Sequence, residues 1–461
     1  MRYTISFLED DYDRLIRHLF AVGAEQAAYL LCGLSVTERE SRLLVRRVIP
    51  VEAGDIVVHS SAHMEIRAKS FLRAMKDADA SRECFVFVHS HPAHCPTHSS
   101  QDDREERKLF ETSYNRIHTP NLIHASLVFS SPDKPVARIW LDGGSVEPVD
   151  VVRIIGKRLR FHVIEGLDHS IDTTFHDRQV RAFGPDLQPL LRRLHVGVVG
   201  AGGTGSAVVE QLVRLGAGHL LVADGGSLEK SNVSRVYGSR VSDDGLAKVK
   251  LMRRLGDEIG LGTKIDLLDK PVTFASVLKR FRDCDVIFGC TDDQWGRSLL
   301  DSFSLAYLIP AFDLGVKINS EEGIIHTIQG RVTLLRPGKP CLFCRKRISQ
   351  ETVLAEQLAE LNPAEAKRRT RERYIPELTQ RDPAVIAFTT AVAASAIGEF
   401  LHQLTGFKGP DYDISEVLHR FDYTTINTPG ARSRSGCQCS DVRAFGRGDQ
   451  HRFLGMNWRP E

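Results

Sequence analysis

Two histidines, a serine and an aspartate have the types and spacing of a metal-hydrolase site. They are the run His89-Ser90-His91-Pro92, then Ser99 and Asp102. Residues 84–88 predict a strand that ends at the first histidine, and side chains two positions apart on a strand project from the same face. Two imidazoles and one carboxylate make the three-ligand set of a catalytic zinc, with the fourth position left for water. Ser99 would donate a hydrogen bond to the oxyanion that forms on the attacked carbonyl.

A general base is also needed at such a site. We expect it to be Glu25, close to a predicted buried strand at residues 29–32, with Glu52 and Glu65 as alternatives. The base would take a proton from the attacking water and pass it to the leaving amine. The competing interpretation is that these histidines are ordinary surface or core residues, because His94 and His98 lie in the same loop.

The spacing His-x-His-Pro, six residues, Ser, two residues, Asp resembles the motif of the JAMM (JAB/MPN) metalloproteases. The resemblance covers about residues 1–145. It implies an α+β domain with a zinc isopeptidase activity similar to that of deubiquitinases. His89, His91 and Asp102 would hold the zinc.

A second group of residues, more than a hundred positions further on, has the pattern of a nucleotide site. The run Gly200-Ala201-Gly202-Gly203-Thr204-Gly205 lies between a predicted strand at 195–199 and a predicted helix at 205–215. Backbone amides and the helix N-terminus bind phosphate in such a loop. Asp224 ends the next predicted strand, where a carboxylate can accept hydrogen bonds from ribose hydroxyls.

Several charged or polar residues accompany this loop, namely Asn232, Arg235, Lys248, Asp292, Arg297 and, upstream, Arg178. A protein carboxylate that attacks the α-phosphate of ATP meets strong like-charge repulsion, so catalysis must supply cations and in-line positioning. A hydride-transfer enzyme needs no such array. The alternative is that these are surface charges on an ordinary sheet protein.

This combination resembles the ThiF-type and ubiquitin-activating adenylyltransferases across about residues 172–445. The resemblance implies an ATP site made of Gly200, Gly202, Gly203, Gly205, Asp224, Asn232, Arg235, Lys248 and Asp292. In it Asp224 would hold the ribose, Arg235 and Lys248 would balance charge on the triphosphate, and Asp292 would help to hold Mg²⁺. Arg178 would reach the ATP of a partner subunit, which implies a homodimer.

The nine cysteines indicate reduced thiols, metal ligands or a nucleophile, because the count is odd and no export signal precedes them. Cys341 and Cys344 have the spacing of half a structural zinc site, and Cys437 and Cys439 could be the other half. The family resemblance supports this second zinc. No cysteine lies between the two halves, so three outcomes stay open. The acyl-adenylate is the end product, it passes to a partner thiol, or a hydroxyl in residues 345–382 takes the acyl group.

The elements predicted around the metal-hydrolase residues are a mixture of helices and strands. They are helices at 10–20 and 61–76, strands at 29–32, 43–48, 56–58, 84–88, 125–130 and 137–141, and a charged helix after Asp102. Around the second group strands at 195–199, 219–223 and 286–289 alternate with helices at 205–215 and 246–259. That alternation predicts a mainly parallel, doubly wound, Rossmann-like sheet. The expected division is a protease domain at 1–150, a linker at 151–171, an adenylation domain at 172–445 and a C-terminal tail at 446–461.

Composition narrows the class of protein. The chain has 461 residues, of which 42% are hydrophobic and 26% charged, so two or three globular domains are expected. Its 61 basic and 59 acidic residues argue against nucleic acid or a membrane surface as partner. The apolar stretch at 384–397 is too short to cross a bilayer, so we expect a soluble, cytoplasmic protein.

These observations predict a bifunctional enzyme of α/β class. One half would cleave ubiquitin-like precursors or conjugates, and the other would adenylate the C-terminal glycine of a ubiquitin-like or sulfur-carrier protein, with a conjugating-enzyme-like protein as a possible further partner. The expected cofactors are Zn²⁺, ATP and Mg²⁺. The alternatives are adenylation of a peptide or small carboxylate, and a non-catalytic scaffold that binds a ubiquitin-like protein.

Overall fold

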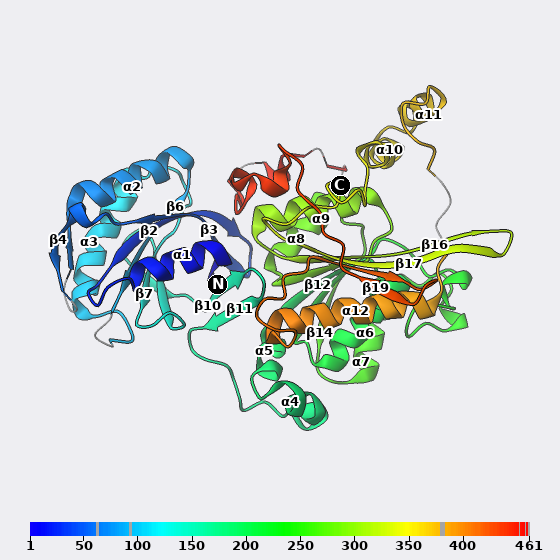
Figure 1. Ribbon diagram of the computed structural model, residues 1–461, viewed down its shortest axis with the longest axis horizontal. Coiled ribbons are helices and arrows are strands. Elements are labelled where there is room, and N and C mark those ends of the chain that lie inside the picture. The colour runs from blue at the N-terminus through cyan, green and yellow to red at the C-terminus, as the bar shows by residue number, and fades with distance from the viewer. Residues whose placement is uncertain (61–63, 92–94, 379–382, 451, 457, 460–461) are drawn as a thin grey trace. The chain divides into compact units, whose positions relative to one another are not determined.

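The computed structural model describes residues 1–461 except 61–63, 92–94, 379–382, 451, 457 and 460–461. The chain divides into two compact units, each described by itself below (Figure 1). Unit 1 comprises residues 1–166, 306–308 and 442–455, and unit 2 comprises residues 167–305, 309–441 and 456–461.

A nine-stranded sheet forms the centre of unit 1, with the strand order β11-β10-β1-β3-β2-β6-β7-β8-β9. Its strands are β1 (Arg2–Leu8), β2 (Ala27–Val36), β3 (Glu40–Pro50), β6 (Cys84–Ser90), β7 (His124–Phe129), β8 (Pro135–Trp140), β9 (Val146–Pro148), β10 (Val151–Ile155) and β11 (Leu159–Val163). A separate hairpin pairs β4 (Ile56–His59) with β5 (Met64–Ile66).

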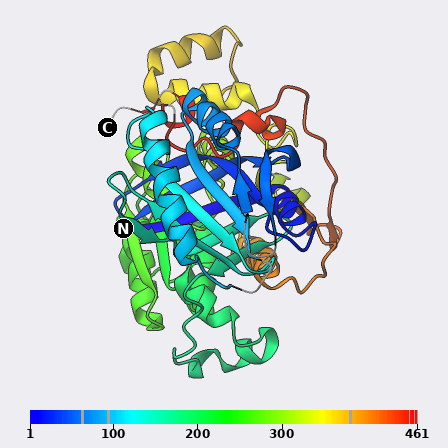
Figure 2. The same cartoon turned by 90° about the vertical axis from the view of Figure 1, so that its left-hand side faces the viewer.

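Helices cover both faces of this sheet, α1 (Glu9–Leu19) on one side and α2 (Ala68–Ser81) and α3 (Ser100–Arg116) on the other (Figure 2). One buried core joins Leu15 of α1 to strands including β1, β2 and β6. The second core joins Met75 of α2 and Phe110 of α3 to the opposite face. Both faces of the central strands are therefore apolar, which accounts for the continuous burial of β2 from Ala27 to Ser35.

The structure differs from the expected elements of unit 1, and two of the differences concern the linker and the start of a helix. Residues 151–163, expected within the linker, form β10 and β11, and β10 pairs in parallel with β1. Every residue of β10 is buried, because its apolar side chains extend the sheet and Arg153 pairs with the buried Glu40. The helix expected at 61–76 is displaced, since residues 64–66 form β5 and the helix begins at Ala68.

An eight-stranded sheet forms the centre of unit 2, with the order β14-β13-β12-β15-β16-β17-β18-β19. Its strands are β12 (His195–Val199), β13 (His219–Ala223), β14 (Lys264–Leu268), β15 (Val286–Gly289), β16 (Ala311–Glu321), β17 (Ile324–Leu335), β18 (Glu416–Arg420) and β19 (Thr425–Asn427). The first five strands in this order are parallel, and β17 to β19 are antiparallel additions. The predicted α/β class and mostly parallel sheet are confirmed.

The helices of unit 2 lie on both faces of its sheet, with α8 and α9 on one side and α6, α7 and α12 on the other (Figure 1). They are α4 (Asp177–Phe183), α5 (Leu187–Arg193), α6 (Gly203–Leu215), α7 (Lys248–Ile259), α8 (Ala275–Arg280), α9 (Gln294–Tyr307), α10 (Gln350–Leu361), α11 (Pro363–Arg371) and α12 (Ile386–Thr405). The apolar stretch noted at 384–397 lies mostly in α12, which packs against α6 and strands β16 and β17. Across the described residues, the helices fall short of the length and apolar character that membrane crossing requires.

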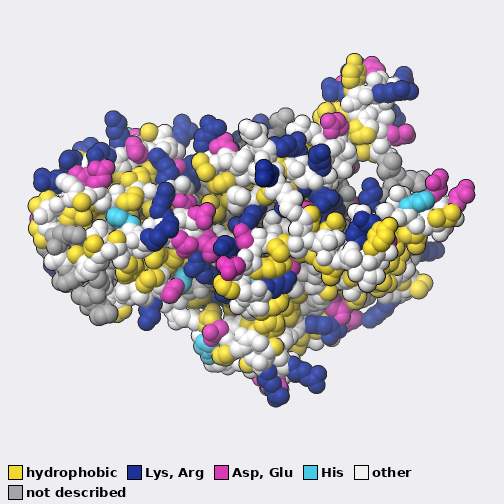
Figure 3. Space-filling view, viewed as in Figure 1, with side chains coloured by type: hydrophobic (Ala, Val, Ile, Leu, Met, Phe, Trp, Pro, Cys, Tyr) yellow, Lys and Arg dark blue, Asp and Glu magenta, His cyan; other side chains and the backbone are white. Residues whose placement is uncertain are grey.

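Charge is distributed evenly on the visible face, where basic and acidic side chains are interspersed rather than separated (Figure 3). The basic run at 367–373 also has acidic side chains beside its basic ones. Arg368 of α11 pairs with Glu365 and Glu372, and all three side chains are solvent-accessible. The run is thus a charged helix face with its own counter-charges.

Candidate functional site

The predicted metal ligands of unit 1 converge on one point. His89 Nε2 lies 3.0 Å from His91 Nε2, and the Asp102 carboxylate oxygens lie 3.2 Å from His89 Nε2 and 3.4 Å from His91 Nε2. A zinc ion with ligand bonds of about 2.0–2.1 Å in tetrahedral geometry separates its ligand atoms by about 3.3 Å. The three side chains therefore fit a single divalent ion of that size.

Strand pairing explains why both histidines face the same way. His89 is the penultimate residue of β6 and pairs with Ala27 of β2. Ser90, between the histidines, points to the other face, where its hydroxyl donates to Leu19 O at 3.0 Å and accepts from Gln26 N at 3.0 Å. These two bonds fix the end of β6, so the flanking imidazoles project together.

Asp102 is held by the start of α3. Ser99 is the N-cap residue, its Oγ accepts from Asp102 N at 3.2 Å, and Asp102 Oδ2 accepts from Ser99 N at 2.6 Å. This reciprocal pair is a capping box. The oxygen of Ser99 thus has a positioning contact with a candidate metal ligand, and the donation of its hydroxyl to an oxyanion stays a prediction.

The electrostatics of the cluster favour a bound cation. Burial opposes the charged form of Asp102, but hydrogen bonds from His89 and His91 hold the pKa of its carboxyl well below the usual range. Burial would lower the pKa of His91, and the hydrogen bond and charge of Asp102 outweigh it and raise that pKa to about 9. The two imidazole nitrogens and the carboxylate thus compete for protons at close range. A bound metal ion would take the place of those protons and interact with all three groups.

His98, which shares the loop, is not part of the ligand set. Its Nε2 lies 3.2 Å from Ser126 Oγ and 3.8 Å from Glu106 Oε1. Burial, and then the charge of Arg138, lower the pKa of His98 to about 2, so the ring is neutral. Glu106 in turn binds Arg138 at 2.8 Å, which joins α3 to β8. His94 lies outside the described residues.

Glu25 lies beside the cluster, immediately before β2. Its charge acts on His91, and extending the β2–β6 register by two residues from the Ala27–His89 pair places it opposite His91. The two alternatives, Glu52 and Glu65, are exposed and lie at the edges of the β4–β5 hairpin segment. Among the three carboxylates, Glu25 is the one beside the cluster, and its role as the base stays a prediction.

The glycine loop of unit 2 lies at the carboxyl ends of parallel strands. Gly200 has φ of 91°, and a Cβ there would sit 2.7 Å from Cys290 O, so only glycine fits this turn. The Asp224 carboxylate accepts from Ala201 N and from Gly226 N, each at 2.7 Å. Asp224 therefore ties the phosphate-type loop to the end of β13, the position expected for a ribose-binding carboxylate.

Cations surround the same loop. A Cβ on Gly226 would lie 3.1 Å from both Asp224 Oδ1 and Lys248 Nζ, which shows that the Lys248 ammonium lies close to this carboxylate. A Cβ on Gly203 would lie 3.2 Å from Arg235 Cγ, so the Arg235 side chain packs on the glycine loop. Asn232 is buried one turn earlier and closes a capping box with Glu229. The absence of a side chain at Gly226 leaves the space that Lys248 occupies.

Asp292 and Asp293 follow β15 at the same edge of the sheet but differ in their contacts. Asp293 accepts from Gly296 N and from Thr291 Oγ1, and so caps α9. Asp292 is exposed, and no contact of its carboxylate is recorded among the described residues. Of the two, Asp292 is the one whose oxygens remain available to a metal ion.

Arg178 is not brought together with these residues within one chain. It lies exposed on α4, next to Gln179, whose side chain donates to Arg214 O at 3.2 Å. Arg214 is at the end of α6, a helix of 13 residues whose first turn is the glycine loop. At 1.5 Å per residue the two ends are about 20 Å apart. The role expected for Arg178, at the ATP of a partner subunit, stays a prediction.

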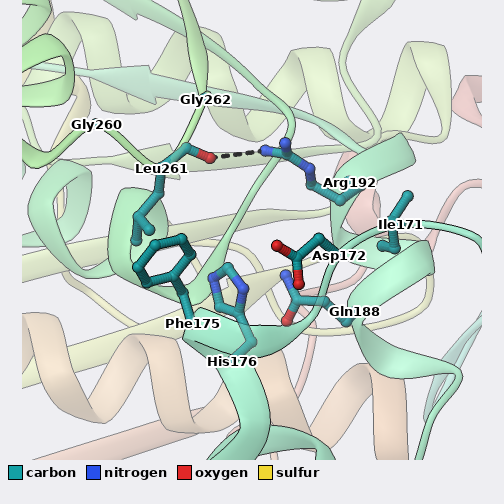
Figure 4. A pocket seen from close by; sticks show the side chains of 9 residues that line it. All are labelled: Ile171, Asp172, Phe175, His176, Gln188, Arg192, Gly260, Leu261 and Gly262. Atoms are coloured by element: carbon teal, nitrogen blue, oxygen red, sulfur yellow. Dashed lines mark hydrogen bonds between the residues drawn. The ribbon is translucent and has the colours of Figure 1, made fainter.

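A pocket at that far end of α6 is distinct from the glycine loop (Figure 4). It is lined by Ile171, Asp172, Phe175, His176, Gln188, Arg192, Gly260, Leu261 and Gly262. Both ring nitrogens of His176 are buried without a hydrogen-bond partner, and a Cβ on Gly216 would lie 2.7 Å from Nε2. The buried imidazole therefore packs against the end of α6 at one wall of the pocket.

The four cysteines of the expected second zinc site also converge. Cys341 Sγ lies 3.5 Å from Cys437 Sγ, and Cys344 Sγ lies 3.7 Å from Cys439 Sγ. All four sulfur atoms lie within 4.8 Å of one another and none forms a disulfide. Tetrahedral zinc with bonds of about 2.3 Å separates its sulfurs by about 3.8 Å. The single-residue spacing of Cys437 and Cys439 thus still allows a four-thiolate site.

The backbone supports thiolate character at Cys344, whereas burial raises the pKa of the Cys341 and Cys439 thiols. Burial opposes it, but the N–H of Arg434, 3.2 Å from Cys344 Sγ, contributes to lowering the pKa of the Cys344 thiol to about 7. Cys341 accepts a similar contact from Cys344 N at 3.5 Å. Such N–H···S contacts are the outer contacts that metal-bound sulfurs receive.

A buried charge cluster on β16 and β17 was not predicted from the sequence. Arg331 NH2 lies 2.8 Å from Asp313 Oδ2, and Arg297 Nε lies 3.6 Å from Asp313 Oδ1. Both Asp313 and Arg331 are buried. The available signal was an acid in the apolar first part of one strand and a single arginine in the next. Its meaning depends on the antiparallel register, which pairs Asp313 with Thr333 and Gly315 with Arg331.

Comparison with known proteins agrees with this geometry. The model of the ThiF family matches residues 176–440, more than half of the chain. The chain belongs to the ThiF family. The model of prokaryotic homologs of the JAB domain matches residues 9–141. The predicted pairing of a JAB-type region with a ThiF-type region is therefore confirmed.

Individual relatives are distant and match only a part of the chain. The SAMP-activating enzyme E1 of Haloferax volcanii is 28% identical over 38% of this chain and 63% of its own length. The molybdopterin-synthase adenylyltransferase of Escherichia coli is 27% identical over 39% of this chain and 70% of its own. A solved structure of E. coli MccB with succinimide has a TM-score of 0.46 and 14% identity, over 59% of this chain and 76% of that one. The matched region thus spans less than two thirds of the first relative.

Proposed function

We propose that the ThiF-family unit adenylates the C-terminal glycine of a ubiquitin-like or sulfur-carrier protein with ATP. The observation that carries the proposal is the arrangement at the ends of β12, β13 and β15. There Asp224 bonds the glycine loop and Lys248, Arg235 and Asp292 lie at one sheet edge. Related adenylyltransferases in the ThiF family include enzymes named for SAMP activation and for molybdopterin synthase.

The residues have complementary parts in that reaction. The amides of the glycine loop and the first turn of α6 would bind phosphate oxygens, and Asp224 would accept from the ribose hydroxyls. Lys248 and Arg235 would offset the repulsion between the attacking carboxylate and the α-phosphate. Mg²⁺, held with the help of Asp292, would neutralise charge that develops on the departing pyrophosphate.

Arg178 extends the proposal to a homodimer. Within one chain it lies about 20 Å from the glycine loop, by the length of α6. An exposed arginine on the short helix α4 is suited to reach the triphosphate of a second copy, where a guanidinium would add a further cation. The dimer would then contain two sites, each completed by its partner.

We propose in addition that unit 1 is a zinc isopeptidase that trims precursors or cleaves conjugates of the same carrier protein. His89, His91 and Asp102 would hold the zinc, which when bound activates water and polarises the scissile carbonyl. Glu25, beside His91, would carry a proton from the attacking water to the leaving amine. The Ser99 capping box would keep the Asp102 carboxylate oriented.

The closed cysteine cluster would hold a second, structural zinc. The other candidates, adenylation of a free peptide or small carboxylate and a non-catalytic carrier-binding scaffold, share the same fold. They differ from the proposal in whether nucleotide chemistry occurs and whether it requires the carrier protein. A scaffold gives no nucleotide chemistry, and a small-carboxylate enzyme gives exchange without a protein substrate.

The test is pyrophosphate exchange into ATP. The full chain, loaded with zinc, is incubated with ATP, Mg²⁺ and the small β-grasp protein encoded nearest to its own gene. The matched control is the same β-grasp protein without its last glycine. We expect exchange that requires the intact glycine terminus, together with an AMP adduct on the carrier. Exchange that is equal with both carriers, or absent with both, would refute the proposal.

A further inference from the structure

The pocket at the far end of α6 takes no part in the adenylation proposed above (Figure 4). It lies within unit 2, and the length of α6 separates it from the glycine loop. Its volume is about 270 Å³, at the small end of the range for ligand sites. A small molecule fits such a volume, whereas a folded partner or an extended peptide does not.

The two sides of this pocket differ in polarity. Figure 4 shows the Phe175 ring and the Leu261 side chain together on the left, and Asp172 and Arg192 on the right. Phe175 is 79% exposed, so its ring face is available to a ligand at the rim. A matching ligand therefore has an apolar part on one side and charged groups on the other.

Asp172 and Arg192 are each held in place by bonds that leave further polar atoms available. Asp172 Oδ1 accepts from the N–H and the hydroxyl of Thr174 at 2.9 and 2.6 Å, which keeps the pKa of its carboxyl below the usual value. Arg192 NH1 donates to Leu261 O at 3.0 Å. Among the described residues, no partner is recorded for Asp172 Oδ2 or Arg192 NH2. A negative and a positive charge thus line the same small pocket.

The floor of the pocket holds buried polar atoms. His176 is 6% exposed and Gln188 is 2% exposed, and within the described residues both ring nitrogens of His176 and Oε1 of Gln188 lack a hydrogen-bond partner. Most buried polar groups are paired, so two such side chains at one cavity favour a ligand-binding role over packing alone.

His176 can offer one of its nitrogens to the pocket. Burial, and then the charge of Arg192, lower the pKa of His176, so the ring is neutral and has one donor and one acceptor nitrogen. Because neither nitrogen has a hydrogen bond to lose, the ring can turn about its last side-chain torsion at little cost. Such a turn presents the acceptor nitrogen to a ligand.

A single ion does not suit this set of groups. The charges of Arg192 and Asp172 both act on the His176 ring, so the two groups surround the same space. An inorganic anion on Arg192 would be repelled by the carboxylate, and a metal ion on Asp172 and His176 would be repelled by the guanidinium. A molecule that carries both charges avoids both repulsions.

We propose that the pocket binds a free α-amino acid with an apolar side chain. An ammonium group has three donors, which match the acceptors of Asp172, Gln188 and His176. The carboxylate of the amino acid would pair with the Arg192 guanidinium, a strong charge-assisted contact. Its side chain would lie against Phe175 and the neighbouring apolar wall. The site needs neither ATP nor the carrier, so it goes beyond the proposed adenylation and stands apart from it.

The test is isothermal titration calorimetry on the full chain without ATP or carrier, with L-leucine, L-methionine and L-phenylalanine as probes. We expect at least one of them to bind saturably, one molecule per chain, with a dissociation constant of about 1 mM or tighter. The amide of the tightest probe lacks the carboxylate, and its deaminated acid lacks the ammonium. For leucine these matched controls are leucinamide and 4-methylpentanoate, and each should bind about tenfold more weakly or worse.

Two substitutions remove one charge each from the pocket. Asp172→Asn keeps the oxygen that accepts the turn bonds, and Arg192→Gln keeps a polar side chain, and each should weaken binding about tenfold or more. The control for the first is Asp168→Asn, because Asp168 Oδ1 accepts the same two kinds of bond from Ser170. The control for the second is Arg193→Gln, at the exposed next residue. Both controls should bind within twofold of the parent.

Hydrogen exchange of the parent gives a second measurement that needs no variant. His176 is the N-cap residue of α4, so a bound amino acid should slow exchange across residues 171–183. Unchanged exchange there at saturating amino acid overturns the proposal, even if a variant fails to fold.

Three calorimetric results would also overturn it. They are no saturable binding of any of the three probes, equal affinity for an amino acid and its amide or deaminated acid, and variants Asp172→Asn and Arg192→Gln that both bind within twofold of the parent. Pyrophosphate exchange with the β-grasp carrier, measured on the same preparation, tests the adenylation separately. Failure of either proposal can thus be told from failure of the other.

Discussion

Ser99 and Asp102 hold each other at the first turn of α3, each accepting the backbone N–H of the other. The contact joins a helix cap to a candidate metal ligand. A capping box stabilises a helix start by satisfying two amides that otherwise lack partners. Here it also restricts the Asp102 carboxylate to the orientation in which it meets His89 and His91.

Replacing Ser99 by alanine separates the two roles proposed for this serine. Loss of the cap should destabilise the start of α3 by about 1 kcal/mol, and loss of orientation at Asp102 should weaken zinc binding about tenfold. Hydrogen exchange of α3 amides and zinc titration measure the two effects. Ser100→Ala, one residue on and exposed, is the control and should change neither. If cleavage instead falls a hundredfold or more while zinc affinity is unchanged, Ser99 is the oxyanion donor first expected from the sequence.

Much of each site follows from short stretches of sequence, because local geometry places the residues. Residues two apart at the end of a strand share a face, which brings His89 and His91 together. A loop between strand and helix presents Gly200 to Asp224. Long-range pairing could not be derived in this way. The burial of β10 depends on its register with β1, and the Asp313–Arg331 pair depends on how β16 and β17 align. Neither register is encoded in a local pattern of residue types.

The packing of the C-terminal segment at 442–455 also could not be derived from local sequence patterns. Sequence predicts a tail from residue 446, whereas the structure packs this segment into unit 1, where Arg46 donates to Phe445 O at 3.0 Å and Asp449 accepts from Val36 N at 2.9 Å. The partners are about 400 residues away in the chain, beyond the reach of any periodicity. Only the density of glycine and aromatic residues marks the segment as something that packs closely.

Gly33→Ala should release that segment from unit 1. A Cβ on Gly33 would lie 2.0 Å from Gly446 O, a backbone atom that cannot move without displacing its neighbours. We expect faster hydrogen exchange and faster proteolytic cleavage within 442–455, by tenfold or more. Gly54→Ala is the matched control, because a Cβ there meets no atom within 4 Å. Equal protection in Gly33→Ala and the parent would show that the segment does not depend on this contact.

The buried carboxylate of Glu40 should make unit 1 sensitive to acid. Burial opposes its charge, but Arg153 and then Arg42 hold the pKa of Glu40 well below its usual range, with Arg153 NH1 2.9 Å away. Because the folded state binds its proton more weakly than the unfolded state, this contribution is full above about pH 4.3 and is lost as the pH falls. Glu40→Gln should destabilise unit 1 by about 3–5 kcal/mol at pH 7, since two arginines lose their counter-charge.

Unfolding free energies at pH 7, 5 and 3.5 test this expectation. The difference between the parent and Glu40→Gln should shrink toward acid pH, as protonation of the unfolded parent removes its advantage. Glu38→Gln is the control, because Glu38 is exposed two residues away. A difference that stays constant, or grows, as the pH falls would mean that the carboxylate is not charged in the folded state.

The two activities should be separable by single substitutions. His91→Ala removes one of three ligands in unit 1 and should reduce carrier cleavage to background while leaving pyrophosphate exchange within twofold of the parent. Asp292→Ala removes the free carboxylate at the end of β15 and should reduce exchange a hundredfold or more, as loss of charge stabilisation in a transition state does, while cleavage persists. The reason is that each residue belongs to a unit with its own sheet and core.

Exposed His118→Ala and Asp269→Ala, measured in both assays, are the controls. Loss of both activities in either His91→Ala or Asp292→Ala would require one shared site and would contradict the assignment of cleavage and adenylation to separate units.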